Sequence, residues 1–128
     1  MANASATEKS LYARLGGYDV IAAIVDEFIQ TLMSEPGMAR FASTMSLESR
    51  KRNRQLTIDY LAAKSGGPTL YLGRDMKTAH EGLGISESEW NLAIDHVERA
   101  AAKFKVPQRE SNEFLSLFHV LKQQIVER

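Results

Sequence analysis

The chain has 128 residues, 16 basic and 16 acidic side chains and no cysteine, which fits one domain and excludes disulfides, thiolate nucleophiles and cysteine-bound metal centres. Because the net charge is zero and no apolar run approaches the ~20 residues of a membrane span, we expect neither a nucleic-acid nor a membrane partner. The polar first ten residues lack the apolar core of a signal peptide, so we expect a cytoplasmic protein.

The N-terminal part of the chain is predicted to hold a flexible tail and then two helices. Residues 1–9 are small and polar and are expected to form a flexible tail, which leaves residues 10–128 as the folded domain. A short helix is predicted over residues 10–15, where Gly16–Gly17 ends it. Over residues 18–33, apolar side chains recur with the 3.6-residue period of an amphipathic helix.

Three longer segments complete an all-α pattern. Ser46 can cap a long helix, which must end before the sequence GGP at residues 66–68. Ser86 begins another helix with a capping box, and its apolar stripe is predicted to reach Phe104. Pro107 opens a last helix that buries apolar residues as far along as residue 125. No segment alternates with the period of a strand, so the fold class is predicted to be all-α.

The segment GRDMKTAHEGLGI, residues 73–85, holds one of only three histidines. Met76 and His80 are four residues apart and therefore share one face of about two helical turns, which end at Gly82. A short helix that presents an imidazole can hold a metal or a haem ligand, but a histidine is also an ordinary way to end a helix. On these residues alone, a structural role for His80 is favoured.

The other two histidines show no sign of a ligand role. His96 and His119 lie on long helices with no convergent groups expected around them, so both are predicted to be surface or half-buried structural residues. No His-x-x-x-His or Glu-x-x-His pair occurs, so a helix-borne zinc or di-iron site is unsupported. Only His80 is left as a candidate ligand.

Four stretches of the chain resemble one known family. LYARLGG resembles the family's opening, IVDEFIQTLMSEPGMARF its B helix and the turn after it, and KVP its G–H corner. The most specific stretch is GGPTLYLGRDMKTAHEGLGIS, which resembles the E–F connection and the F helix. On these motifs the chain is similar to the truncated haemoglobins, shortened globins with a two-over-two helical sandwich around a haem, and most similar to their group I.

The resemblance implies a haem-binding globin whose cofactor is haem b, iron protoporphyrin IX, with His80 as the proximal iron ligand. The other ring nitrogen then needs an acceptor, most simply a carbonyl of the same short helix. The implied pocket residues, each of which would equally serve as ordinary core, are Phe28, Ile29, Phe41, Leu61, Met76, Trp90, Ala93 and Phe118. Arg74 and Lys77 would meet the haem propionates, with plain surface solvation as the alternative.

The distal side departs from the family pattern. Group I members commonly carry a tyrosine directly after the phenylalanine that matches Phe28, and its hydroxyl hydrogen-bonds oxygen. This chain has Ile29 there, which cannot donate. Counted back from the second double glycine, the distal face takes Asn53, Leu56 and Thr57, whereas Gln55 would need a slip in register. The departure weakens the expectation of slow oxygen release and of NO dioxygenation.

A sixth iron ligand from the protein is not expected. The distal helix has no histidine, which excludes a bis-histidyl resting state from that helix. Lys51 or Met45 could reach the iron in principle. Ligation by lysine needs the neutral amine, which costs free energy near neutral pH.

Three functions compete. The leading one is a monomeric or weakly dimeric haem protein that reversibly binds O2 or NO, and also CO, for oxygen binding or transport. The second is a haem enzyme, such as an NO dioxygenase or a peroxidase-like catalyst, which needs distal groups that steer oxygen and a reductase partner. The third is a haem-free helical interaction domain, since fold alone does not fix function. The spacing of Tyr71, Met76 and His80, which matches the family, speaks against this third function.

Overall fold

The structure is a computed structural model, and it describes residues 9–128. Its helices are α2 (Leu11–Leu15), α3 (Tyr18–Met33), α4 (Leu47–Lys64), α5 (Met76–His80), α6 (Glu87–Lys103), α7 (Gln108–His119) and α8 (Lys122–Ile125), with a 3-10 turn, η1 (Ala39–Phe41). These residues contain no strand, which confirms the all-α prediction. Of the tail predicted for residues 1–9, only Lys9 lies within the described residues.

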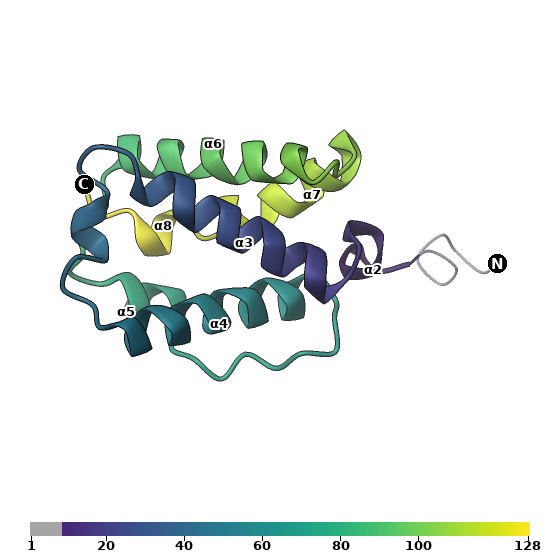
Figure 1. The fold of residues 1–128 in the computed structure, drawn as a ribbon, viewed down its shortest axis with the longest axis horizontal. Coiled ribbons are helices and arrows are strands. Elements are labelled where there is room, and N and C mark those ends of the chain that lie inside the picture. Colours follow the sequence, from purple (N-terminus) through teal and green to yellow (C-terminus); the bar gives the residue numbers. More distant parts are fainter. Residues whose placement is uncertain (1–8) are drawn as a thin grey trace.

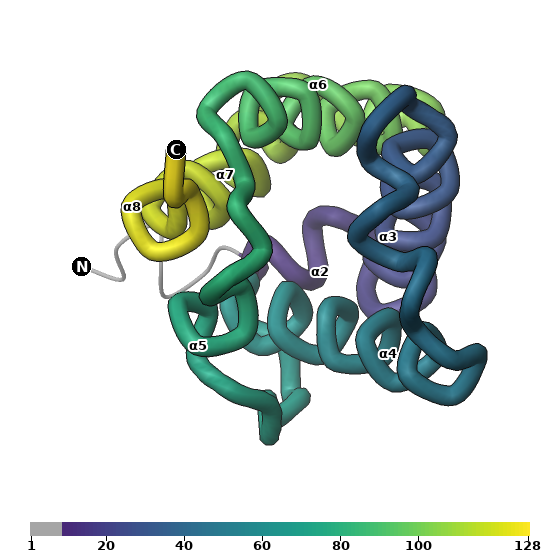
Figure 2. Tube along the Cα trace, turned by 90° about the vertical axis from the view of Figure 1, so that its left-hand side faces the viewer, coloured from purple at the N-terminus to yellow at the C-terminus, as the bar shows by residue number. Residues whose placement is uncertain are grey.

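The four long helices form two pairs, α3 with α4 and α6 with α7 (Figure 1). Helix α3 packs against both α4 and α6, and α6 packs against α7. Figure 2 shows α6, α3, α4, α5 and α8 following one another around the molecule, with α5 beside α8. Along residues 9–128, no helix is both long enough and apolar enough to span a membrane.

The main core joins α3 to the helices around it. The predicted stripe of α3 places Ile21, Ile24 and Val25 on one face, and all three are fully buried. Other buried members come from α2, α4, α6 and α7: Leu15, Ile58, Leu61, Ala62, Val97, Ala100, Phe114 and Leu115. Burying one large aliphatic or aromatic side chain is worth about 1.5–3 kcal/mol, so this cluster supplies most of the stabilisation.

A second, smaller apolar cluster sits where α5 meets α8. Its buried members are Trp90, Leu121 and Ile125. Partly buried side chains surround them: Tyr60, Met76, Ile85, Ile94, Phe118 and Val126. This cluster lies next to the segment that carries the candidate histidine, and Phe118 and Tyr60 connect it to the main core.

Two sequence predictions about helix ends are wrong. Phe104, predicted to extend the stripe of α6, is the residue after the last helical turn and is 39% exposed. The last helix is broken: α7 ends at His119, and α8 begins at Lys122 after the exposed Val120. No glycine or proline lies between residues 117 and 126 to signal the break. The turn places Leu121 and Ile125 in one cluster with Trp90, so the packing of these side chains determines where the helix breaks.

Glu89 ties the start of α6 to η1. The predicted capping box is confirmed: Ser86 Oγ accepts from the Glu89 amide at 3.1 Å, and Glu89 Oε1 accepts from the Ser86 amide at 2.9 Å. The second carboxylate oxygen lies 2.7 Å from Arg40 Nη1. Arg40 first, and then the Ser86 amide, lower the pKa of Glu89 to about 2.

Glu89→Gln is expected to lower the free energy of unfolding at pH 7 by about 1 kcal/mol, as for a lost cap and ion pair. Because the folded-state pKa is depressed, the difference from the unaltered protein should be complete above the ordinary value of 4.5 and shrink as the pH falls toward 2. Urea unfolding at pH 7 and pH 3 measures it. Glu98→Gln, at an exposed position on α6, is the control. A difference that is unchanged at pH 3 would contradict the assignment.

Candidate functional site

Helix α5 presents His80 as the sequence predicted, although it spans five residues rather than two full turns. Asp75 caps its start, accepting from the Thr78 amide at 3.3 Å, and Thr78 holds the pKa of the Asp75 carboxyl below its ordinary value. His80 is half-buried, and its Nδ1 lies 2.8 Å from the carbonyl oxygen of Met76. Since a carbonyl only accepts, Nδ1 is the donor and Nε2 keeps a free lone pair. Within residues 9–128 Nε2 has no hydrogen-bond partner.

The structure brings three of the predicted pocket residues together beside α5. Met76, Trp90 and Phe118 all belong to the smaller apolar cluster, and Phe118 also packs edge-on against Phe114 at 5.4 Å between ring centroids. Phe28, Ile29 and Leu61 lie instead at the main core, where Leu61 is buried and the other two are half-buried. The predicted set therefore divides between the two clusters that Phe118 connects.

Four other predicted residues belong to neither apolar cluster. Phe41 is half-buried under the guanidinium of Arg40, which is 4.0 Å from its ring centroid, and Ala93 is half-buried on α6. Arg74 and Lys77 are exposed at the start of α5. Two roles were predicted for these cations, binding of an anion and plain solvation. Both require an exposed side chain.

The distal side of α4 offers few free donors. The Thr57 hydroxyl donates to the Asn53 carbonyl at 2.8 Å, and the exposed Asn53 amide nitrogen lies 3.7 Å from the sulfur of Met45. Leu56, which lies between Asn53 and Thr57 in the sequence, is half-buried. The Gln55 amide donates to the Tyr18 hydroxyl and, at 3.1 Å, to Asp59. These two bonds hold the exposed Gln55 side chain at Tyr18 and Asp59.

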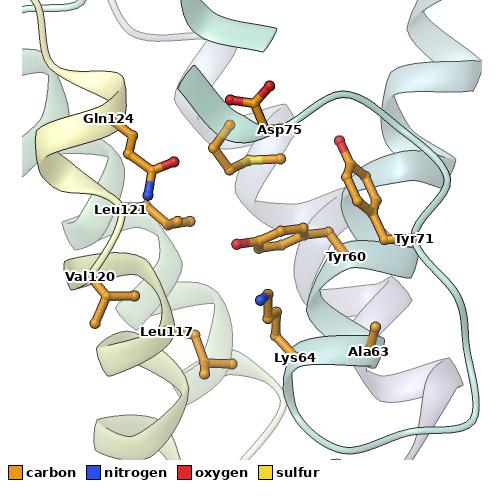
Figure 3. Close-up of a pocket in the computed structure, with 10 residues that line it drawn as sticks. Tyr60, Ala63, Lys64, Tyr71, Asp75, Leu117, Val120, Leu121 and Gln124 are labelled. Atoms are coloured by element: carbon orange, nitrogen blue, oxygen red, sulfur yellow. The ribbon is translucent and has the colours of Figure 1, made fainter. Parts of the chain in front are cut away.

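A cavity of about 640 Å³ lies between α4 on one side and α5, α7 and α8 on the other (Figure 3). This volume is within the ~300–1,000 Å³ of ligand pockets. Its lining residues are Tyr60, Ala63, Lys64, Tyr71, Asp75, Met76, Leu117, Val120, Leu121 and Gln124. Of the residues predicted from the sequence only Met76 lines it, and His80 lies one turn further along α5.

Two tyrosines shape one wall of this cavity. Tyr60 and Tyr71 pack edge-to-face with 5.1 Å between ring centroids, and burial raises the pKa of both phenols. The Tyr71 hydroxyl donates to the Arg74 carbonyl, which closes the loop before α5. The ring lies so close to Gly73 that a Cβ there would be 2.5 Å from the Tyr71 hydroxyl oxygen, so a larger residue would force the Tyr71 ring to move.

Lys64 places a cation at the same cavity. Its ammonium nitrogen is 5.6 Å from the centroid of the Tyr60 ring, and Figure 3 shows both side chains projecting from α4. Tyr60 and Lys64, which line the cavity, are not among the site residues predicted from the sequence. Continuing the helical spacing from Leu56 through Tyr60 to Lys64 would have found them, but a lysine interrupts an apolar stripe and was not counted.

His96 was predicted to be at the surface or half-buried with no convergent groups, and this part of the prediction is wrong. Its side chain is only 6% exposed, and polar groups converge on both ring nitrogens: Nε2 lies 2.7 Å from Glu35 Oε2, and Nδ1 lies 2.9 Å from Thr31 Oγ1. These partners are reached because α3 packs along α6, a pairing that the local sequence does not show. His119 is exposed, as predicted.

The residues present fit a haem. Among the described residues, no group of three or more His, Asp or Glu side chains could hold a bare metal ion. Haem iron needs only one such ligand from the protein, because the porphyrin supplies the others. His80 offers a free Nε2, fixed by the bond of Nδ1 to its own helix, beside an apolar cluster and a cavity with a lysine at its wall.

Haem is expected to quench the fluorescence of Trp90, the single tryptophan of the chain. Trp90 is buried in the cluster that contains Met76, one turn before His80. Titrating the haem-free protein with haem and following the emission measures this. The emission should fall to a small fraction of its starting value, whereas a bright haem-loaded sample would place Trp90 far from the cofactor.

Comparisons with known proteins show the family of the chain. The family model of the bacterial-like globins matches residues 10–127. A Group 1 truncated haemoglobin of Mycolicibacterium paratuberculosis is 28% identical over 106 residues, which cover 83% of this chain and 76% of the relative. A Group 1 truncated haemoglobin of Tetrahymena pyriformis is 22% identical over 105 residues, which cover 82% and 84%.

Solved structures share the fold. The truncated haemoglobin of Tetrahymena pyriformis in its Fe(III) form matches with a TM-score of 0.85 at 19% identity, over 94% of this chain and 100% of that one. The 2/2 haemoglobin of a Synechococcus species, in a cyanomet state with covalently attached haem, matches with a TM-score of 0.82 at 20% identity, over 94% and 100%. These matches confirm the predicted two-over-two globin fold. The chain, which is similar to the group 1 truncated haemoglobins, thus belongs to the bacterial-like globins, a family that implies haem binding.

Proposed function

We propose that this protein holds haem b through His80 and reversibly binds O2 or NO. The observation that carries the proposal is the state of His80, whose Nδ1 donates to the Met76 carbonyl at 2.8 Å while nothing in residues 9–128 bonds Nε2. When bound, haem b would supply an iron atom with a position open to a diatomic gas. The carbonyl of Met76 would fix the tautomer and the ring orientation of His80, as the outer partners of metal-ligating histidines do.

Apolar and cationic side chains would hold the porphyrin. Met76, Trp90 and Phe118 form a preassembled apolar surface beside α5. For the propionates, Lys64 is better placed than the two cations predicted from the sequence, because it lines the cavity whereas Arg74 and Lys77 lie outside it. Cation–carboxylate contacts at such a rim would orient the cofactor more than they would strengthen its binding.

The distal side supports gas binding over an enzyme. Catalysis such as NO dioxygenation needs preorganised donors aimed at the reacting oxygen. Ile29 has no donor, the Thr57 hydroxyl is committed to the Asn53 carbonyl, and the exposed Gln55 amide is bonded to Tyr18. The NO dioxygenase and peroxidase-like alternatives therefore take second place.

Gas binding by the haem-loaded, reduced protein tests the proposal. We expect CO to give a spectral change that light reverses. We expect O2 to give a spectral change that deoxygenation reverses, provided that the oxygen is removed before the iron oxidises. A ferrous spectrum that neither gas alters would contradict the proposal. Sustained conversion of NO to nitrate in the presence of O2 and a reductase would favour the enzyme instead.

Three further properties stay predictions from the sequence: the reductase, the monomeric or weakly dimeric state and the cytoplasmic location.

A further inference from the structure

The segment that follows His80 has no regular structure to hold it. Gly82 and Gly84 have φ angles of 84° and 68°, in the left-handed region, so the chain turns twice between α5 and α6. A single local hydrogen bond, from the Leu83 amide to the His80 carbonyl at 3.2 Å, spans the first turn. A helix of five residues is also too short to be stable by itself. The orientation of His80 therefore depends on what restrains its surroundings.

The carboxylate of Glu127 supplies such a restraint. Its Oε2 accepts from the Gly82 amide at 2.9 Å, and its Oε1 accepts from the Gly84 amide at 2.7 Å. Both are charge-assisted hydrogen bonds, the stronger kind. The two amides lower the pKa of the Glu127 carboxyl, so it is ionised at neutral pH. One side chain thus satisfies the backbone on both turns of the segment.

Main-chain bonds reinforce the same contact. The Glu127 amide donates to the Ile85 carbonyl at 2.8 Å, and the Glu87 amide donates to the Arg128 carbonyl at 2.9 Å. Arg128 Nε donates to the Gly84 carbonyl at 3.0 Å. We call this contact, between residues 82–87 and residues 127–128, the clasp. It joins positions more than 40 residues apart in the chain, as the separation of 43 between Glu127 and Gly84 shows.

The clasp has a buried anchor. Ile125, two residues before Glu127, is 7% exposed and packs in the cluster with Trp90. Helix α8, which it ends, packs against α5 itself. The position of Glu127 relative to His80 is therefore set by core packing rather than by a loop free to move.

We propose that Glu127 is a positioning residue for His80: through Gly82 and Gly84 it fixes the segment after α5 and so sets the direction of the imidazole. The inference rests on the proposed role of His80 as the iron ligand. Without the carboxylate, the segment 82–84 gains freedom, α5 shifts more easily, and the bond from His80 to iron is formed in a wider range of geometries. Glu127 would touch neither the haem nor the gas.

Glu127→Gln tests the proposal with little change in side-chain size. A glutamine has one acceptor oxygen, so at least one of the two glycine amides loses its partner. In the haem-free protein, hydrogen exchange measured by NMR should be about tenfold faster at Gly82 and Gly84, as expected for a lost hydrogen bond to a charged group. Glu98→Gln, at an exposed carboxylate on α6, should leave these rates unchanged. Unchanged exchange in Glu127→Gln would overturn the proposal.

The second readout separates positioning from a merely structural role. In the reduced, haem-loaded protein, resonance Raman spectra report the iron–histidine stretching band. Glu127→Gln should broaden this band and move it to lower frequency, while Glu98→Gln should match the unaltered protein. A band that is present but unmoved in Glu127→Gln contradicts this inference alone. The absence of an iron–histidine band from the unaltered protein contradicts the proposed function and the inference together.

Discussion

His80→Ala is expected to remove the iron's protein ligand and to lower haem affinity by about a hundredfold or more, since even ~3 kcal/mol of lost binding corresponds to that factor. The physical reason is that no other histidine can replace it: His96 is buried with both ring nitrogens occupied, and His119 is exposed on α7. The measurement is a haem titration of the variant followed by the ferrous spectrum, with and without added imidazole.

Imidazole should restore the spectrum of His80→Ala by filling the space of the lost side chain. His119→Ala and His96→Ala are the matched controls, and both should keep the iron spectrum. His96→Ala should nevertheless unfold more readily, because it empties the buried space of the imidazole and removes its contacts with Thr31 and Glu35. If His80→Ala keeps its haem affinity and its five-coordinate ferrous spectrum without imidazole, the ligand assignment is wrong.

Ile29→Tyr is expected to slow O2 release by about one to two factors of ten, because a hydroxyl donor to the partly negative bound gas is worth about 1–3 kcal/mol and each ~1.4 kcal/mol is tenfold. In the unaltered protein, we accordingly expect rapid O2 release, ready oxidation of the iron and a preference for CO, which is less polar when bound. Stopped-flow displacement of O2 by CO measures the release rate.

Two further variants test whether another distal donor exists. Thr57→Val and Asn53→Leu should change O2 release by less than about tenfold, the factor for ~1.4 kcal/mol, because the Thr57 hydroxyl already donates to the Asn53 carbonyl and the Asn53 amide faces Met45. A larger acceleration in either variant would show a distal donor and refute the apolar pocket. If Ile29→Tyr leaves O2 release unchanged with haem still bound, Ile29 does not face the gas.

The features that the sequence could predict are the local ones. The course of α3 follows from the 3.6-residue stripe and its start from Gly16–Gly17, and the start of α6 follows from the Ser86 capping box. Met76 and His80 lie on one face of a short helix because their spacing requires it. The break between α7 and α8 could not be predicted, because it comes from packing of Leu121 against Trp90 and not from a glycine or proline.

The features that the sequence could not predict join distant parts of the chain. His96 meets Thr31 and Glu35 across the α3–α6 contact, and Glu127 reaches Gly82 and Gly84 from the far end of the described residues. Neither pairing has a local pattern, since each depends on how two helices are laid against one another.

The central claim, that one haem binds at His80, is tested most directly by titrating the haem-free protein with haem and recording the ferrous spectrum. We expect saturation at one haem per chain, an intense Soret band and a five-coordinate, histidine-ligated ferrous iron that CO converts to a six-coordinate form. A protein that remains folded but develops no Soret band when haem is supplied would contradict the account and would support a helical domain that keeps the globin fold without its cofactor.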